Sequence, residues 1–151
     1  MGATLFMDFV ALVQKHILAQ LPLNYAMVGR WIGHMFKGRF IHQAIPESTP
    51  IRGERLIGWI SHYLIGIIFA VVFLVSIGDA WMNRPTPLPA ALFGVLTVLA
   101  PFLILQPAFG AGLAASCAPR PVVTRARSVL AHLSFGVGLW ISALCLSALA
   151  A

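Results

Sequence analysis

An arginine, a histidine seven residues later and a glycine four residues after that form a pattern that occurs twice. It is found as Arg55-x6-His62-x3-Gly66 and, 70 residues further on, as Arg125-x6-His132-x3-Gly136. Seven residues make two helical turns, so in a helix each arginine shares a face with its histidine. Both segments are expected to cross a membrane in the same direction, which places the two histidines at similar depth.

Two histidines at one depth allow three kinds of chemistry. They could ligate a b-type haem axially, with the glycines leaving room for the macrocycle and the arginines near the propionates. They could contact a quinone head or relay protons. They could also hydrogen-bond across helix interfaces, where the glycines allow close packing. A tetrahedral zinc site is disfavoured because no carboxylate or thiol lies at matching depth.

Two further polar residues interrupt apolar segments. Asp8 is an ionisable group inside the first of them, where burial in lipid is costly. It either hydrogen-bonds a neighbouring helix or handles an ion, a proton or a substrate. Gln106 stands before Pro107 and a run of small residues. Such breaks build sites in transporters, although small residues also mark ordinary packing faces.

These residues predict one polar site inside the membrane. It would handle a small molecule, an ion or a proton and would be lined by Asp8, His62, Gln106 and His132. Basic residues would contact anionic headgroups or an anionic substrate: Arg30, Lys37, Arg55 and Arg125. No catalytic residue and no metal site other than the haem alternative at the two histidines is assigned.

The composition indicates that these residues are positioned by membrane-spanning segments. Hydrophobic residues make up 60% of the 151 residues, charged residues only 9%, and the mean hydropathy is +0.91. A soluble enzyme is excluded because too few charges are available to cover its surface. Segments long enough to cross a bilayer lie at about 3–23, 56–77, 88–113 and 129–150.

The distribution of positive charge sets the expected orientation. The connections after the first and third segments carry eight arginines and lysines, against Arg84 alone in the connection between the second and third. Positive residues stay on the cytoplasmic side. We therefore expect cytoplasmic basic connections and both termini on the outer side. The formal charge of +6 is thus explained by topology, with no nucleic-acid partner.

The first connection is predicted to begin with a helix over residues 25–37. Apolar and aromatic residues fall on one arc of that helix, and Arg30, His34 and Lys37 fall on the other. Basic amphipathic helices of this kind lie in the headgroup plane of anionic membranes. A recognition surface for a partner or ligand is the alternative.

Several short motifs occur in order along the chain. They are Gly2-Ala3-Thr4-x-x-Met7-Asp8, Asn24-Tyr25-Ala26-x-Val28-Gly29-Arg30-Trp31-x-Gly33-His34, Gly38-Arg39-Phe40, Gly53-Glu54-Arg55-x-x-Gly58-Trp59-x-x-His62-Tyr63 and Ala100-Pro101-Phe102-x-x-x-Gln106-Pro107-Ala108-x-Gly110-x-Gly112. Together they resemble a bacterial family of small four-helix inner-membrane proteins known only as a domain of unknown function. The resemblance implies that topology and a bacterial plasma membrane, and it implies no activity.

The sequence therefore predicts a single all-α membrane domain with four transmembrane helices and an interfacial helix between the first two. The leading functional hypothesis is a small-molecule or ion binding or transport component. A haem or quinone redox carrier that uses His62 and His132 is one alternative, and a structural or accessory subunit is another. The partners expected are the lipid bilayer and its anionic headgroups, and small-residue helix faces are compatible with a homodimer.

Overall fold

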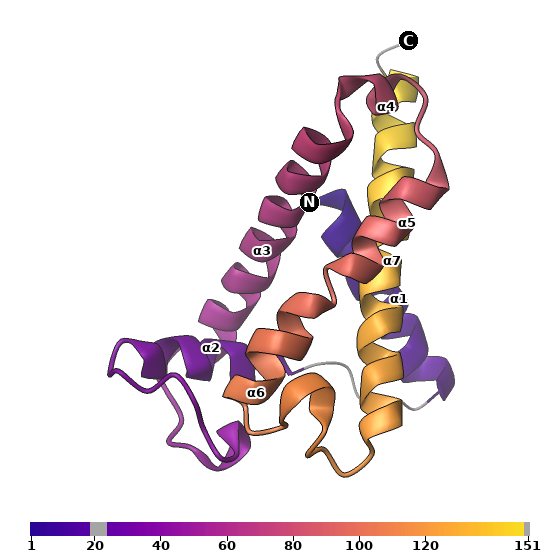
Figure 1. Ribbon diagram of the computed structural model, residues 1–151. Helices are drawn as coiled ribbons and strands as arrows, with labels where there is room; N and C mark the ends of the chain where they lie inside the picture. The colour runs from indigo at the N-terminus through magenta and orange to yellow at the C-terminus, as the bar shows by residue number, and fades with distance from the viewer. Residues whose placement is uncertain (19–23, 150–151) are drawn as a thin grey trace. The chain divides into compact units, whose positions relative to one another are not determined.

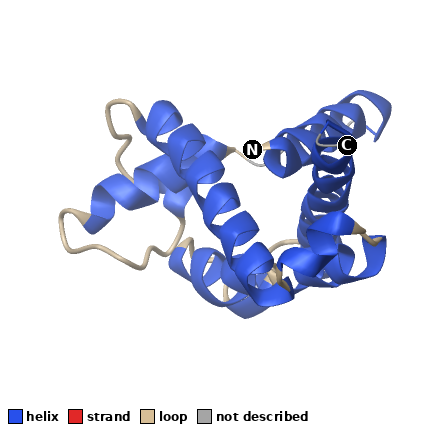
Figure 2. Cartoon of the chain, turned by 90° about the horizontal axis from the view of Figure 1, so that it is seen from above, coloured by secondary structure: helices blue, strands red, loops and turns tan. Residues whose placement is uncertain are grey.

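The computed structural model describes residues 1–18 and 24–149, and within them every regular element is helical (Figures 1 and 2). The long helices are α1 (Gly2–Leu18), α2 (Tyr25–Met35), α3 (Glu54–Ile77), α5 (Pro87–Leu96) and α7 (Pro121–Leu149). Short elements join them: η1 (Ile45–Glu47), α4 (Asp79–Asn83), η2 (Pro101–Leu105), α6 (Gln106–Ala108) and η3 (Leu113–Ala115). The all-helical fold class is confirmed.

The chain divides into two compact units. Unit 1 contains residues 1–22, 65–98 and 129–151, and unit 2 contains residues 23–64 and 99–128. The core of unit 1 mixes large aromatic residues with small ones, namely Ala3, Phe73, Trp81, Ala90, Phe135, Leu139 and Ala143. Aromatic rings meet edge-on within it, since the Phe73 and Trp81 centroids lie 4.9 Å apart at 84°.

Unit 1 depends on close helix contacts at residues without bulky side chains. A Cβ atom added at Gly94 of α5 would collide with the backbone of Gly136 in α7. A Cβ atom added at Gly136 would in turn collide with the carbonyl oxygen of Ala90. In a membrane, where burial of apolar surface does not drive helices together, such contacts supply van der Waals packing.

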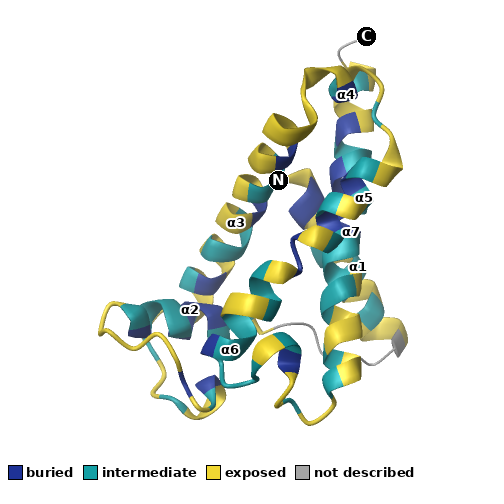
Figure 3. Ribbon diagram, in the orientation of Figure 1, coloured by how far each residue is buried: buried dark blue, intermediate teal, exposed yellow. Residues whose placement is uncertain are grey.

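Three described helices are long and apolar enough to cross a membrane. They cover Glu54–Ile77, Pro87–Ala108 and Pro121–Leu149. Much of the α3 ribbon is exposed in Figure 3. Its exposed large hydrophobic residues include Ile60 at 59% and Val75 at 80%. Exposed apolar surface on this scale is unsuited to water and suited to lipid. These features are those of a membrane protein.

The first predicted span is described only in part. α1 has 17 residues, which corresponds to about 26 Å of helix. The rest of that predicted span, residues 19–23, lies outside the described residues, as does residue 150 of the fourth. The predicted helix over residues 25–37 exists as α2, and Asn24 caps it by accepting a hydrogen bond from the Ala26 N–H at 3.1 Å.

The third apolar segment is interrupted, in agreement with the break expected at Pro107. Pro101 offers no N–H, and the chain forms a π-helical turn in which the Gln106 N–H donates to the Pro101 carbonyl. The helix ends at Ala108, before Gly110 with a φ of +88°. This segment therefore ends about five residues before the predicted end at 113.

Replacing Gly136 by leucine should destabilise unit 1. The added side chain would collide with the backbone of α5, and overpacking costs about 1–3 kcal/mol. The free energy of unfolding in detergent, measured by denaturant titration, should fall accordingly. The matched control is Ala148→Leu, which adds a similar side chain at an exposed position of the same helix and should have little effect. Equal stability of the two variants would contradict the contact.

Candidate functional site

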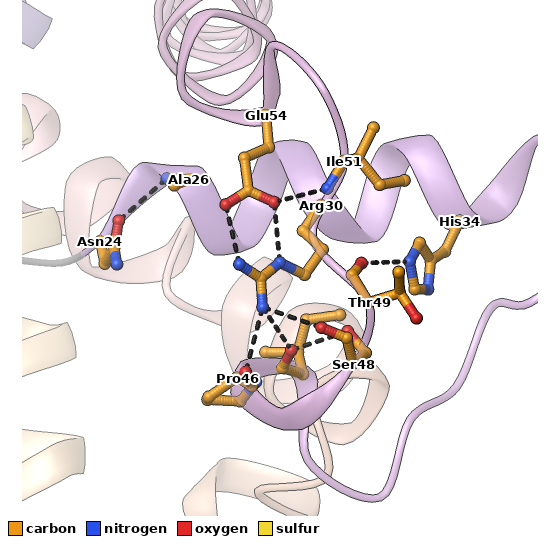
Figure 4. Close-up of polar contacts among 10 residues, drawn as sticks. Asn24, Ala26, Arg30, His34, Pro46, Ser48, Thr49, Ile51 and Glu54 are labelled. Atoms are coloured by element: carbon orange, nitrogen blue, oxygen red, sulfur yellow. Dashed lines mark hydrogen bonds and ion pairs between the residues drawn. The ribbon is translucent and has the colours of Figure 1, made fainter.

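A buried arginine organises the polar part of unit 2. Arg30 of α2 is 7% exposed. Its Nε and Nη2 donate to the two carboxylate oxygens of Glu54, each at 2.8 Å, in a bidentate ion pair (Figure 4). Its Nη1 donates to the carbonyl oxygens of Pro46 and Ser48 at 3.0 Å and of Ile45 at 3.4 Å. The guanidinium thus joins α2, the connecting segment and the start of α3.

Glu54 completes this junction. Its Oε2 also accepts the backbone N–H of Ile51 at 3.0 Å, so the carboxylate caps the turn that leads into α3. Arginine suits this position because its planar fork matches a carboxylate and leaves further donors for carbonyl groups. Hydrogen bonding to Glu54 raises the pKa of Arg30, against the opposing effect of burial. The prediction that Arg30 contacts headgroups is untested, but the donors described here are all used within the protein.

Two buried histidines form a second polar contact in unit 2. His34 of α2 and His42 of the connecting segment are 3% and 5% exposed. His34 Nδ1 lies 2.8 Å from His42 Nε2, and His34 Nε2 lies 2.9 Å from the carbonyl oxygen of Thr49. The sequence predicts His34 on the polar face of α2 and indicates no role for His42. Their pairing is a feature that the structure adds.

The positions of the protons follow from these partners. A carbonyl oxygen only accepts, so His34 Nε2 must carry a proton. In neutral His34, Nδ1 is then an acceptor, and His42 Nε2 must donate to it. Neutral His42 therefore keeps a lone pair on Nδ1, which is buried and has no hydrogen-bond partner among the described residues. Burial lowers the pKa of His42, and the neighbouring His34 and the positive charge of Arg39 disfavour its protonated form further.

The segment that carries His42 is docked on the broken end of the third apolar helix. The His42 N–H donates to the Ala108 carbonyl at 2.9 Å, and the Ile45 N–H donates to the Phe109 carbonyl at 3.2 Å. Carbonyls at a helix C-terminus have no partners within the helix, so they are available for these bonds. A Cβ atom at Gly110 would collide with the Gln43 carbonyl, so glycine permits the approach.

A polar pocket of about 340 Å³ opens in this docked segment. It is lined by Arg39, Ile41, His42, Gln43, Ala44, Glu47 and Ser48. Arg39 and Glu47 carry opposite charges, and no ion pair within 4 Å joins them in the described structure. Unit 1 contains a larger pocket of about 450 Å³ whose lining is apolar except for Ser76. The Ser76 hydroxyl donates to the Val72 carbonyl, so the polar pocket offers more chemistry.

Gln106 and His132, predicted to line an intramembrane site, both make contacts that join helices. Gln106 Nε2 donates to the Ser128 hydroxyl at 3.2 Å within unit 2. His132 Nδ1 lies 2.7 Å from the Thr97 hydroxyl within unit 1. That hydroxyl donates to the Gly94 carbonyl at 2.6 Å, so His132 is the donor in the second contact. Each contact is a hydrogen bond of the kind that packs membrane helices.

The two glycines of the repeated pattern lie against other helices. Gly66 faces the Thr4 side chain closely enough that a Cβ atom would collide with it. Gly136 faces Ala90 and Ala91 of α5. The space that the haem hypothesis assigned to a macrocycle at these glycines is therefore occupied by protein. This arrangement supports the packing interpretation of the glycines.

The other residues of the predicted site are half-buried or exposed. Asp8 is half-buried on α1, and His62 is half-buried with its ring stacked on Tyr25 at a centroid distance of 4.1 Å. The exposed basic residues predicted to meet headgroups are Lys37, Arg55 and Arg125. Arg125 also donates to the Ala114 carbonyl at 2.6 Å. No group of three His, Cys, Asp or Glu side chains able to hold a metal occurs in the part of the chain described.

Comparison with known proteins identifies the family. A family model described as "Protein of unknown function (DUF2938)" matches residues 1–146. The chain belongs to this family. This match confirms the resemblance to a domain of unknown function that the ordered motifs indicate. No match was found among curated proteins or among solved structures.

One signal in the sequence points to the buried site of this family member. Arg30 and His34 are four residues apart on the polar face of one helix, and Glu54 is one of only four acidic residues in the chain. A scarce acid at the far end of the connection that follows a face with arginine and histidine is a candidate partner for that face. The pairing of His34 with His42 has no comparable signal because the intervening chain is irregular.

Removing the Arg30 side chain should destabilise the protein strongly. Arg30→Met leaves Glu54 and three carbonyl oxygens without their donor, and loss of one partner of a buried ion pair costs roughly 3–5 kcal/mol. The free energy of unfolding in detergent measures the loss. Arg55→Met, at an exposed arginine, is the control and should change stability by about 0.5 kcal/mol or less. The double variant Arg30→Met/Glu54→Leu should recover part of the loss, whereas strictly additive effects would contradict the pairing.

Proposed function

We propose that this protein is a small four-span membrane protein that binds a small zwitterionic ligand in the polar pocket of residues 39–48. In this proposal α1 is the first span, α2 lies in the plane of the headgroups, and the basic connections face the cytoplasm. The apolar composition of α1 and the distribution of positive charge support this topology. The polar pocket then lies at the cytoplasmic surface of the bacterial inner membrane.

Two opposite charges in the polar pocket that form no ion pair with each other indicate the kind of ligand. Arg39 and Glu47 line the same pocket without an ion pair within 4 Å between them. An anionic ligand would gain from the arginine but meet the glutamate, and a cationic ligand would do the reverse. A ligand with both an anionic group and a protonated amine gains from both charges. A phosphoethanolamine group has this chemistry, whether it is free in solution or the headgroup of a lipid.

The proposed function is still the binding of a small ligand. The proposed site is now the polar pocket of residues 39–48. The site predicted from the sequence consists of Asp8, His62, Gln106 and His132. Two of these, Gln106 and His132, make hydrogen bonds that pack helices. The docking of the pocket segment on residues 108 and 109 supports a transport role, because it joins the pocket to a broken helix. The haem alternative lacks support at its glycines, and no observation favours a quinone.

Phosphoethanolamine should stabilise the purified protein more than inorganic phosphate or ethanolamine does at equal concentration. A ligand that binds only the folded state raises its stability according to its affinity, so a thermal unfolding series in detergent at pH 8 reports binding. Glu47→Gln should weaken the binding of phosphoethanolamine about two- to fivefold. It should not weaken the binding of inorganic phosphate, which has no amine to interact with Glu47. Arg39→Gln should weaken both.

Arg120→Gln provides the matched control, because Arg120 is an exposed arginine that does not line the pocket. It should leave the stabilisation unchanged. Repeating the series in bilayers with phosphatidylethanolamine separates the sources, since a lipid headgroup already in the pocket would abolish the effect of the free compound. Equal stabilisation by phosphate and phosphoethanolamine would overturn the zwitterion assignment.

The proposed topology is tested by cysteine labelling in intact cells. In a Cys145→Ala background, native Cys117 lies in the second basic connection and should resist a membrane-impermeant maleimide until the cells are opened. With Cys117 also replaced by alanine, Thr86→Cys should react from outside, because residue 86 lies between the second and third spans. The reverse pattern would contradict the orientation.

A further inference from the structure

In the His34–His42 pair, a second proton on His42 would have no hydrogen-bond acceptor among the described residues. A proton can be added to the neutral ring only at Nδ1, since Nε2 already donates to His34. Nδ1 is buried, and no acceptor for it occurs among the described residues. A protonated His42 would therefore hold a buried N–H without a partner in addition to its charge. Buried unpaired donors and charges are both disfavoured.

The charged and titratable groups around His42 do not offset this penalty. Helix α2 contributes His34 and Arg30, and the start of α3 contributes Glu54, whose carboxylate is paired with Arg30. The segment of His42 itself contributes Arg39, whose positive charge opposes protonation, and the exposed Glu47. Residues 106–110, against which His42 is docked, contain no ionisable side chain.

Docking of the segment depends on the same residue. The backbone N–H of His42 makes one of the two hydrogen bonds that hold the segment to residues 108 and 109. Ile45, which makes the other, is 2% exposed. Moving the His42 ring into water therefore disturbs both the contact with the broken helix and the pocket that His42 lines.

We propose that the His34–His42 pair makes this docking acid-sensitive. A proton added to His42 Nδ1 favours release of residues 42–45 from residues 108–109, so the released ring can be hydrated. The proton on His34 Nε2 stays in place, and the proton on His42 Nε2 remains there. Release would also open the polar pocket, and only this consequence for ligand binding rests on the proposed function.

The docking of residues 42–45 should weaken as the pH falls, because the docked form buries the neutral ring of His42. The docked form has a His42 pKa below the ordinary value of 6.5, so it binds fewer protons than the released form. Docking is therefore strongest above about pH 6.5 and weakens as the pH falls below that value. One proton makes the docking constant fall about tenfold for each pH unit, until the pH reaches the pKa of the docked form.

Nitrogen-15 NMR of the histidine-labelled full chain in nanodiscs tests this between pH 8 and pH 5. At pH 8 we expect both His34 and His42 to carry the proton on Nε2 and none on Nδ1. The signal assigned to His42 by its loss in His42→Gln should take up a proton at Nδ1 below pH 6.5. The amide protection factors of His42 and Ile45, corrected for the intrinsic pH dependence of exchange, should fall together with that titration. Protection that persists to pH 5 would overturn the proposal.

His42→Gln is the decisive variant. The Gln side-chain amide can still donate to His34 but cannot titrate, so the protection of residues 42 and 45 should no longer depend on pH. His16→Gln removes an exposed histidine of α1 and should leave the transition intact. A transition that survives in His42→Gln overturns the proposal.

Arg39→Gln serves as a second test if His42→Gln fails to fold. It removes a positive charge that opposes protonation, so the midpoint should move upward toward pH 6.5. A midpoint that does not move overturns the proposal. If the unmodified protein shows the acid transition but does not bind phosphoethanolamine, the proposed ligand is wrong and the acid-sensitive docking stands.

Discussion

Unit 2 depends on the requirement that a buried guanidinium must have acceptors for its donors. Taking a cation out of water costs several kcal/mol unless it is paired and hydrogen-bonded. Arg30 meets this requirement with one carboxylate and three backbone carbonyls from residues 45–48. The path of the connecting segment is set by the need to present these oxygens. The segment between α2 and α3 is consequently a folded part of unit 2 with a defined shape.

The histidine pair and the polar pocket follow from that path. Once residues 45–48 lie against Arg30, His42 comes within reach of His34, and Thr49 presents its carbonyl to the other side of the same ring. The free carbonyls at the end of α6 then accept the backbone N–H groups of His42 and Ile45. Two features that the sequence shows separately, a basic polar helix and a broken apolar helix, are joined at this segment.

The polar groups within the apolar helices serve packing in the contacts described. His132 and Thr97 join α7 to α5, and Gln106 reaches Ser128. Hydrogen bonds of this kind contribute modestly in a membrane, about 0.6 kcal/mol on average, but they specify which helix faces meet. Close backbone contact at Gly94 and Gly136 acts in the same way. The helices can therefore be positioned without reserving these residues for a cofactor.

Composition and periodicity were sufficient to establish the class of protein and much of its local structure. Low charge and long apolar runs require helices in lipid, because each helix satisfies its own backbone hydrogen bonds. Pro107 indicated a break, and the amphipathic periodicity of residues 25–37 predicted α2. The number of spans stays a prediction. The ordered motifs also indicated the family, which the match over residues 1–146 confirms.

Which polar groups meet depends on contacts between residues that are distant in the sequence. Periodicity assigned Arg30 and His34 to a polar face but could not distinguish headgroups from a folded segment of the same chain as its partner. Glu54 lies 24 residues from Arg30, and an irregular segment separates His34 from His42. Local rules of helix spacing do not extend across such a segment. Its path follows from hydrogen bonds that form only when distant residues are brought together.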